Sequence, residues 1–142
     1  MTVVVDASLA LKWVVPAEDS ETAQHLWVRW QDAGQLLIGP PIFRPEITNA
    51  LYQMVRRAVI QAGEADEALS ALLPVVTIHE PEQLYRRALT IAVELGMGAT
   101  YDALYVALAE AERCELWTAD RKLVRLAQPS FPQVRWIEEA TS

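Results

Sequence analysis

Four acidic residues spread along the chain could do chemistry together: Asp6, Glu46, Asp102 and Asp120. Asp102 is the most unusual, because it is the one charged residue between Tyr101 and Ala109, a stretch otherwise made of Ala, Leu, Val and Tyr. A helix that is apolar on nearly every face is normally buried, and a buried carboxylate needs a partner or a cation. We therefore expect Asp102 to face a cleft in which something compensates its charge.

A divalent cation is the natural partner of several carboxylates that lie close together. Such carboxylates repel one another, and oxygen ligands completed by water are what Mg²⁺ and Mn²⁺ prefer. Taken singly, three of the acids have ordinary structural explanations, since Asp6 and Asp120 can cap helices and Glu46 can sit in a helical first turn. Taken as a set of four, they favour a Mg²⁺ or Mn²⁺ site.

Strands and helices are expected to alternate along the chain. Short apolar runs predict five strands, at residues 3–5, 36–38, 75–78, 116–118 and 134–137. Helices are predicted at residues 8–13, 20–33, 46–63, 64–73, 81–95, 100–110 and in the segment after Asp120. This alternation implies parallel pairing through right-handed crossovers, so the predicted fold class is α/β, a three-layer α/β/α sandwich with a five-stranded parallel sheet.

This architecture can bring the acids together. Ligands of open parallel sheets bind outside the carboxyl ends of the strands, where Asp6 and Asp120 are expected. Glu46 and Asp102 are expected in first turns of helices, with Thr100 as the cap before Asp102, and helix N-termini should keep both carboxylates ionised at neutral pH. In addition, Ser8 and Thr118 could hydrogen-bond a carboxylate or a metal-bound water, although turn and strand-end roles suit them equally.

Composition bounds the kind of protein. The chain has 142 residues, 52% hydrophobic and 22% charged, which predicts one compact domain over residues 1–142. The sequence lacks an apolar run long enough for a membrane span and a signal-peptide pattern, so we expect a cytoplasmic protein without a membrane partner. Cys114, His25 and His79 do not have zinc spacing, and Cys114 is expected to be a small buried residue.

The net charge of −7 argues against simple electrostatic binding to nucleic acid or to an anionic membrane. It leaves room for a local basic groove, because arginines occur in pairs and clusters. These are Arg56 with Arg57, Arg86 with Arg87, and Arg121, Lys122 and Arg125. Arginine suits bidentate phosphate contacts, and a solvated helix face explains such pairs equally well.

Four segments resemble, in order and spacing, the acidic motifs of PIN-domain ribonucleases, and specifically the short VapC-type toxins of prokaryotic toxin-antitoxin pairs. They are VVVDAS (3–8), PEITNAL (45–51), YDALYVALAE (101–110) and WTADRKL (117–123). The resemblance implies a five-stranded parallel sheet, a Mg²⁺ or Mn²⁺ site made by Asp6, Glu46, Asp102 and Asp120, and endoribonuclease activity. It also implies a small antitoxin partner and a homodimer. Ser8 and Thr118 match positions where the family often carries hydroxyls.

The leading hypothesis is metal-dependent hydrolysis of an RNA phosphodiester by the toxin of a toxin-antitoxin pair. Lys12, Arg44 and Arg121 lie near the acids in sequence and could contact the RNA backbone, and Trp13 is either a stacking platform for a base or a core residue. The alternatives are a solitary PIN-domain nuclease and a non-catalytic interaction module that binds a basic partner. Nucleotide-cofactor motifs of the GxGxxG and GxxxxGK kinds do not occur.

Overall fold

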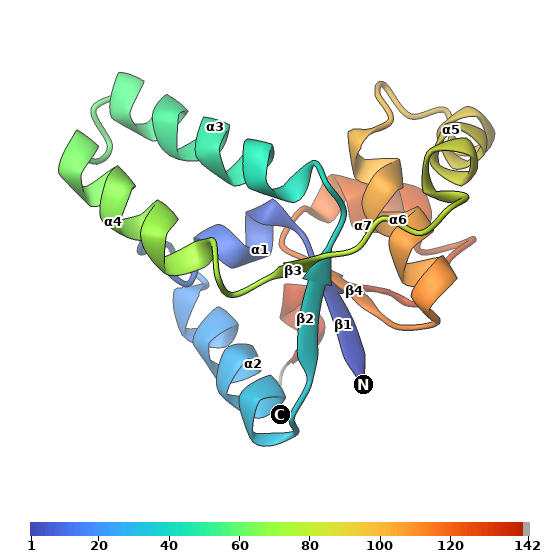
Figure 1. The fold of residues 1–142 in the computed structure, drawn as a ribbon, viewed down its shortest axis with the longest axis horizontal. Helices are drawn as coiled ribbons and strands as arrows, with labels where there is room; N and C mark the ends of the chain where they lie inside the picture. The colour runs from blue at the N-terminus through green and yellow to red at the C-terminus, as the bar shows by residue number, and fades with distance from the viewer. Residues whose placement is uncertain (141–142) are drawn as a thin grey trace.

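A sheet of five parallel strands runs through the centre of the protein, seen in a computed structural model that describes residues 1–140 (Figure 1). The strands are β1 (Thr2–Val5), β2 (Leu36–Gly39), β3 (Thr77–Ile78), β4 (Leu116–Thr118) and β5 (Val134–Trp136). Their order in the sheet is β3-β2-β1-β4-β5. The predicted α/β fold class with a five-stranded parallel sheet is therefore confirmed.

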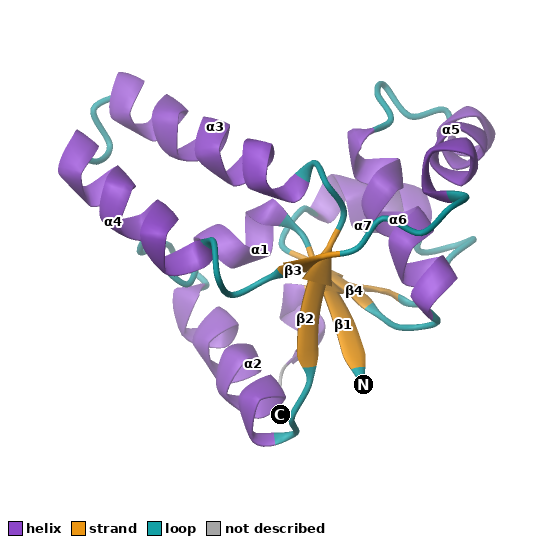
Figure 2. Cartoon of the chain, viewed as in Figure 1, coloured by secondary structure: helices purple, strands orange, loops and turns teal. Residues whose placement is uncertain are grey.

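Helices connect the strands and cover the sheet, as the secondary-structure colouring makes plain (Figure 2). They are α1 (Ala7–Leu11), α2 (Ser20–Asp32), α3 (Phe43–Arg56), α4 (Ala62–Leu72), α5 (Leu84–Leu95), α6 (Tyr101–Glu112) and α7 (Arg121–Ala127), followed by the 3₁₀ helix η1 (Ile137–Ala140). α3 and α4 form a helical hairpin that projects from the body beyond α1. None of the helices in residues 1–140 is long and apolar enough to cross a membrane.

β1 and α6 form the centre of the core. β1 lies between β2 and β4, and its residues Val3, Val4 and Val5 are buried. α6 packs against β1 and β4 and buries every side chain from Ala103 to Ala109, as expected for its apolar sequence. The two elements fix the backbones that carry Asp6 and Asp102, so the candidate site rests on the most rigid part of the fold.

The boundary between α3 and α4 differs from the sequence prediction. α3 begins at Phe43, whose fully buried ring anchors the first turn, and Pro45 is tolerated there because early helical N–H groups have no intrahelical partner. The helix ends at Arg56, and Ala58 adopts a left-handed φ of 56°. The helix predicted over residues 46–63 places Ala58 inside it, and that prediction is wrong because Ala58 is exposed in the turn between the helices.

Other predicted boundaries are also too long. β3 has two residues rather than four, α1 ends at Leu11 rather than Trp13, and α5 begins at Leu84 rather than near Pro81. Trp13, just past α1, packs edge-on against two other tryptophans, and its indole N–H donates to the carbonyl of Ala23 at 2.8 Å. Of the two explanations for Trp13, the contacts favour the core residue.

Candidate active site

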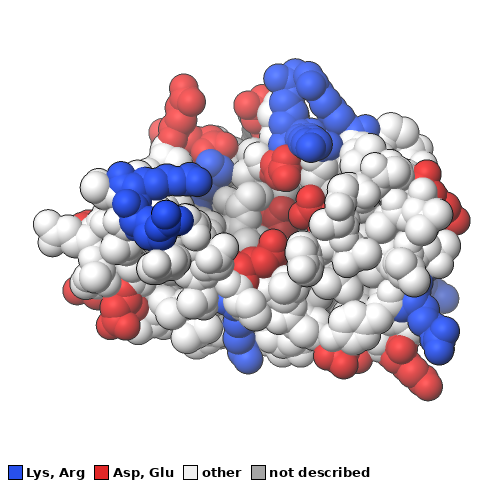
Figure 3. All heavy atoms as spheres, turned by 90° about the horizontal axis from the view of Figure 1, so that it is seen from above, with Lys and Arg blue, Asp and Glu red and all other residues white. Residues whose placement is uncertain are grey.

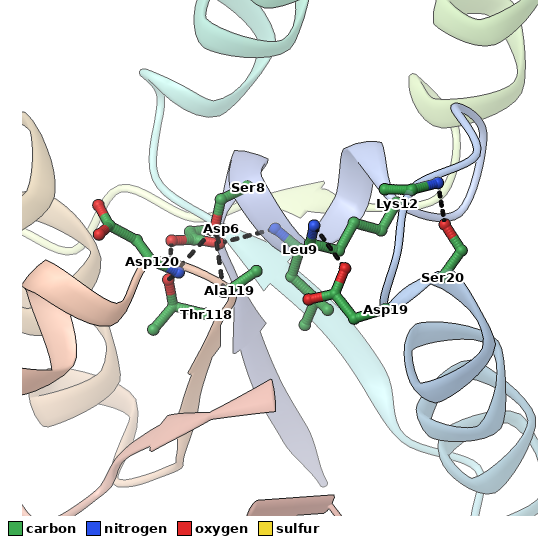
Figure 4. A network of polar contacts seen from close by, with 10 residues as sticks. Asp6, Ser8, Leu9, Lys12, Asp19, Ser20, Thr118, Ala119 and Asp120 are labelled. Carbon is green, nitrogen blue, oxygen red and sulfur yellow. Dashed lines mark hydrogen bonds and ion pairs between the residues drawn. The ribbon is translucent and has the colours of Figure 1, made fainter. Parts of the chain in front are cut away.

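Asp6 lies directly after β1 and is only 5% exposed. Its Oδ1 accepts a hydrogen bond from the amide of Leu9 at 3.1 Å and so caps α1, as the helix-cap explanation required. The same oxygen accepts from the Ser8 hydroxyl at 2.7 Å, while Oδ2 accepts from the Thr118 hydroxyl (Figure 4). Asp6 is therefore a helix cap and, at the same time, the centre of a polar network.

Two backbone amides orient the hydroxyls around Asp6. The amide of Ala119 donates to Ser8 Oγ at 3.0 Å, and the amide of Asp120 donates to Thr118 Oγ1 at 2.9 Å. A hydroxyl has a single proton, so each accepts from an amide and directs its own proton to Asp6. Asp6 is thus held from both sides, which gives Ser8 and Thr118 a positioning role in the structure.

Asp120 occupies the equivalent place at the end of β4. Its Oδ1 accepts from the amides of Lys122 at 2.9 Å and Leu123 at 3.3 Å, which caps α7. The cap uses one carboxylate oxygen and leaves the other available for a ligand. For Asp120, as for Asp6, the structural role and a role as a ligand are compatible.

Glu46 is held by a residue that the sequence analysis did not single out. Tyr105, on α6, is 1% exposed, and its hydroxyl donates to Glu46 Oε1 at 2.5 Å. Burial first, and then the neighbouring Glu46 carboxylate, raises the pKa of Tyr105, so the phenol keeps its proton and acts as a donor. Tyr105 therefore fixes one oxygen of Glu46 from the core side.

Asp102 lies exposed in the first turn of α6 and completes the set. Glu46, Asp102 and Asp120 line one cavity of about 390 Å³, together with Lys122 and the ring of Tyr101. Seen from above, acidic side chains gather near the middle of the molecule with basic ones on either side (Figure 3). Asp6 lies close enough for the charge of Asp102 to raise its pKa.

The pKa values of Asp6, Glu46 and Asp102 are raised. Burial is the largest cause for Asp6, and it raises the pKa to about 6 although Thr118, Ser8 and the amide of Leu9 favour the ionised form. Burial, followed by repulsion from Asp102, raises the pKa of Glu46. Desolvation of the Asp102 carboxylate at the wall of the acidic cavity, followed by repulsion from Asp120, also raises the pKa of Asp102, with Lys122 acting in the opposite direction.

The position in a helical first turn was expected to lower the pKa values of Glu46 and Asp102, and that prediction is wrong in direction because both pKa values are raised. The helix dipole is a modest effect of about 0.3–1 kcal/mol at exposed positions, and burial with like-charge repulsion outweighs it here. The proposed cap is also wrong, because Thr100 makes no side-chain hydrogen bond to the start of α6.

The donor set fits a hard divalent cation. Carboxylate oxygens crowd one cavity, repel one another and have Lys122 as the cation on its wall. Within residues 1–140 no three acidic, His or Cys side chains already converge closely enough to hold an ion by themselves. Mg²⁺ does not require this, since it commonly binds through one or two carboxylates and keeps several waters.

The basic residues near the site have different surroundings. Lys12 is paired with Asp19 at 2.6 Å (Figure 4), and the guanidinium of Arg121 lies over the ring of Trp136, 5.4 Å from its centroid. Arg44 is exposed on the first turn of α3. Lys122, which sequence reasoning passed over in favour of Arg121, is the cation that lines the acidic cavity.

Replacing Tyr105 with Phe should weaken metal binding and cleavage together. The change removes the hydroxyl that fixes Glu46 while keeping the buried ring, and losing a residue that orients a metal ligand typically costs about 10- to 100-fold in affinity or activity. Titration calorimetry with Mn²⁺ and a cleavage assay measure the two effects. Tyr52→Phe, on exposed α3 surface, is the matched control. Unchanged Mn²⁺ affinity in Tyr105→Phe would contradict this role.

Comparison with known proteins supplies an independent view of the chain. The family model described as PIN domain matches residues 3–129. Ribonuclease VapC3 of Pyrobaculum aerophilum is 32% identical over 126 residues, covering 87% of this chain and 92% of that protein. VapC ribonuclease Mb0985 of Mycobacterium bovis is 33% identical over 131 residues, covering 92% and 94%. The crystal structure of PAE2754 from Pyrobaculum aerophilum superposes with a TM-score of 0.72 at 25% identity, covering 98% of this chain and 94% of that one.

Proposed function

This chain belongs to the PIN-domain family, and from that membership we propose that it is a metal-dependent endoribonuclease acting as the toxin of a toxin-antitoxin pair. The observation that carries the proposal is that Glu46, Asp102 and Asp120, from three separate segments, line one cavity, while Asp6 lies near enough to Asp102 for their charges to interact. The relatives named as VapC ribonucleases support the reaction class.

In the proposed site these four carboxylates hold Mg²⁺ or Mn²⁺. When bound, the ion supplies electrophilic activation of the phosphodiester and makes water more acidic. Ser8 and Thr118 hold both oxygens of Asp6, and Tyr105 holds one oxygen of Glu46, so the remaining lone pairs are aimed before an ion arrives.

Lys122 and Arg121 lie next to each other at the start of α7 and are proposed to contact the RNA backbone. Lys122 is the stronger candidate because it lines the acidic cavity. Arg44, exposed on the first turn of α3 two residues before Glu46, is a further candidate. Lys12 is a weaker candidate, because its pairing with Asp19 must break before it can bind a phosphate.

We further propose a small antitoxin partner and a homodimer. The family resemblance supplies both, and a cluster of ionised carboxylates with one lysine suits a basic side chain from such a partner. A neighbouring gene for a DNA-binding protein with a basic tail would support the toxin role, whereas a solitary nuclease would lack one. The alternative of a non-catalytic module predicts partner binding without cleavage.

A panel of defined RNAs incubated with Mg²⁺, Mn²⁺ or EDTA tests the proposed function. Cleavage should require the divalent ion, because one lysine, Lys122, does not offset the charge of the phosphate and the carboxylates together. Products resolved on gels identify the cleaved bond. Cleavage by wild type that persists in EDTA and is lost in Asp102→Asn would overturn the metal dependence, and no cleavage of any RNA with either ion would overturn the nuclease.

A further inference from the structure

Tyr101 stands between two cavities. It is the first residue of α6, is 57% exposed, and lines the acidic cavity next to Asp102. Its other side lines a neighbouring cavity of about 500 Å³ between the starts of α3 and α5, with walls that include Pro41, Ile42 and Leu89. The two cavities therefore adjoin each other and share Tyr101 as a common wall.

The second cavity is apolar, and its side chains remain open to solvent. Tyr85 is 52% exposed and Leu89 is 59% exposed, although both lie beside Tyr101 on its wall. The Tyr85 hydroxyl donates to Glu80 at 3.0 Å, which restrains the ring. Exposed apolar groups that adjoin one another in a hollow are typical of a binding site rather than of ordinary surface.

We propose that this cavity, called the base seat below, binds an unpaired nucleobase next to the cleaved phosphate, with the base stacked on Tyr101. The inference rests on the proposed nuclease function. A phosphate held at the acids leaves the adjoining nucleotide at Tyr101, because that residue borders both cavities. A volume of about 500 Å³ lies within the range of sites for small ligands, which suits a base and excludes a duplex.

The charge of the protein favours stacking as a source of affinity. The net charge is −7, and carboxylates crowd the acidic cavity itself, so contacts to RNA phosphates are few and partly opposed by repulsion. Stacking on an aromatic ring needs no positive charge and works for every base. The base seat therefore favours an unpaired nucleotide beside the cleaved bond, because a base must leave its stack to lie on Tyr101.

The test combines a protein substitution with a substrate lacking one base. Tyr101→Ala should lower kcat/KM about 5- to 150-fold, whereas Tyr101→Phe should change it by no more than about twofold. Removing the base beside the cleaved bond should slow wild type by a similar factor and should have little further effect in Tyr101→Ala. Tyr52→Ala removes an equally exposed tyrosine, 58% exposed, that borders neither cavity, and should behave as wild type.

Binding provides a second measurement that does not depend on catalysis. In single-stranded RNA with 2-aminopurine beside the cleavage position, the fluorescence of 2-aminopurine should be quenched when the RNA binds Asp102→Asn in EDTA. It should not be quenched when the RNA binds the double variant Asp102→Asn with Tyr101→Ala. Absence of cleavage in every protein, with this quenching intact, would overturn the nuclease and keep the base seat.

Three results would overturn the base seat while leaving the nuclease in place. In the first, the losses in kcat/KM caused by Tyr101→Ala and by base removal multiply when the two changes are combined. In the second, Tyr52→Ala lowers kcat/KM as much as Tyr101→Ala does. The third is a change from dimer to monomer in Tyr101→Ala with the sensitivity to base removal unchanged, which would make this surface an interface between two copies. Sedimentation of wild type and Tyr101→Ala distinguishes that case.

Discussion

Asp102→Asn should cleave RNA about 100- to 1,000-fold more slowly than wild type while folding normally. The substitution removes one negative charge from the proposed metal site and preserves the shape of the side chain. Because Asp102 is exposed in the first turn of α6, the free energy of unfolding of the variant should differ from that of wild type by no more than about 0.5 kcal/mol. Cleavage rates, circular dichroism and thermal unfolding measure these effects.

The matched control is Asp66→Asn, an exposed acid on α4 outside the acidic cavity. It makes the same chemical change and should retain wild-type cleavage. Calorimetry with Mn²⁺ should show weaker binding in Asp102→Asn and wild-type binding in Asp66→Asn. Wild-type, metal-dependent cleavage by Asp102→Asn would remove Asp102 from the site.

Asp6→Asn should abolish cleavage and yet make the metal-free protein more stable at neutral pH. Folding buries Asp6 and raises its pKa from the ordinary 3.8 to about 6, which corresponds to a penalty on the order of 3 kcal/mol for ionising it in the folded state. Asn carries no charge and can still accept from Ser8 and the Leu9 amide. Its NH₂ group cannot accept from Thr118, so we expect a net gain of about 1–2 kcal/mol.

The stability gained by Asp6→Asn should depend on pH in a definite direction. Between about pH 4 and 6 the folded chain keeps a proton on Asp6 that the unfolded chain has released, so unfolding releases a proton and wild-type stability falls as the pH rises through this window. The penalty is then fully present at pH 7.5. Asp6→Asn should accordingly exceed wild type in Tm at pH 7.5, and the difference should close as the pH falls below 4.

Bound Mg²⁺ should reverse the order of the Tm values of wild type and Asp6→Asn. Saturating Mg²⁺ stabilises the folded state in proportion to its affinity, so it should raise the Tm of wild type and affect Asp6→Asn much less. Asp66→Asn should follow wild type at every pH and metal concentration. A difference in Tm between wild type and Asp6→Asn that is the same at pH 4 and pH 7.5 would show that the Asp6 charge is not the cause.

The site was predictable where local sequence marks it. Asp6 and Asp120 each follow a short β-branched or apolar run, and Asp102 interrupts an apolar helix, so strand ends and helix starts could be placed. Tyr105 was not predictable in this way. Its place in an apolar run suggested a core residue, and only the packing of α6 beside α3 shows that its hydroxyl reaches Glu46.

The surroundings of the basic residues and the pKa values of the acids depend on distances that the sequence does not give. Arg121 and Lys122 are adjacent, but helical geometry points one to Trp136 and the other into the acidic cavity. Likewise, neither spacing nor residue type indicates that Asp102 lies near enough to Asp6 to raise its pKa. Proximity across the fold decides both.

Fold class was predictable because the strands are short, apolar and separated by helical periodicity. The boundaries of the helices were less predictable than the fold class. Ala58 is a strong helix former, yet it adopts a left-handed conformation just after α3, and a capping box of Gln61 and Glu64 starts α4 shortly afterwards. Sequence shows that such a box is possible, while tertiary packing decides whether the preceding helix continues into it.

The hydrogen bond from Thr118 to Asp6 joins residues 112 positions apart, which bears on how the protein is made. Synthesis proceeds from the N-terminus, so β1 leaves the ribosome long before β4 can pair with it. A nascent chain ending before residue 116 lacks Asp120 and the hydroxyl that orients Asp6. Prematurely terminated products should therefore be inert, and cleavage activity should arise only after residue 120 has emerged from the ribosome.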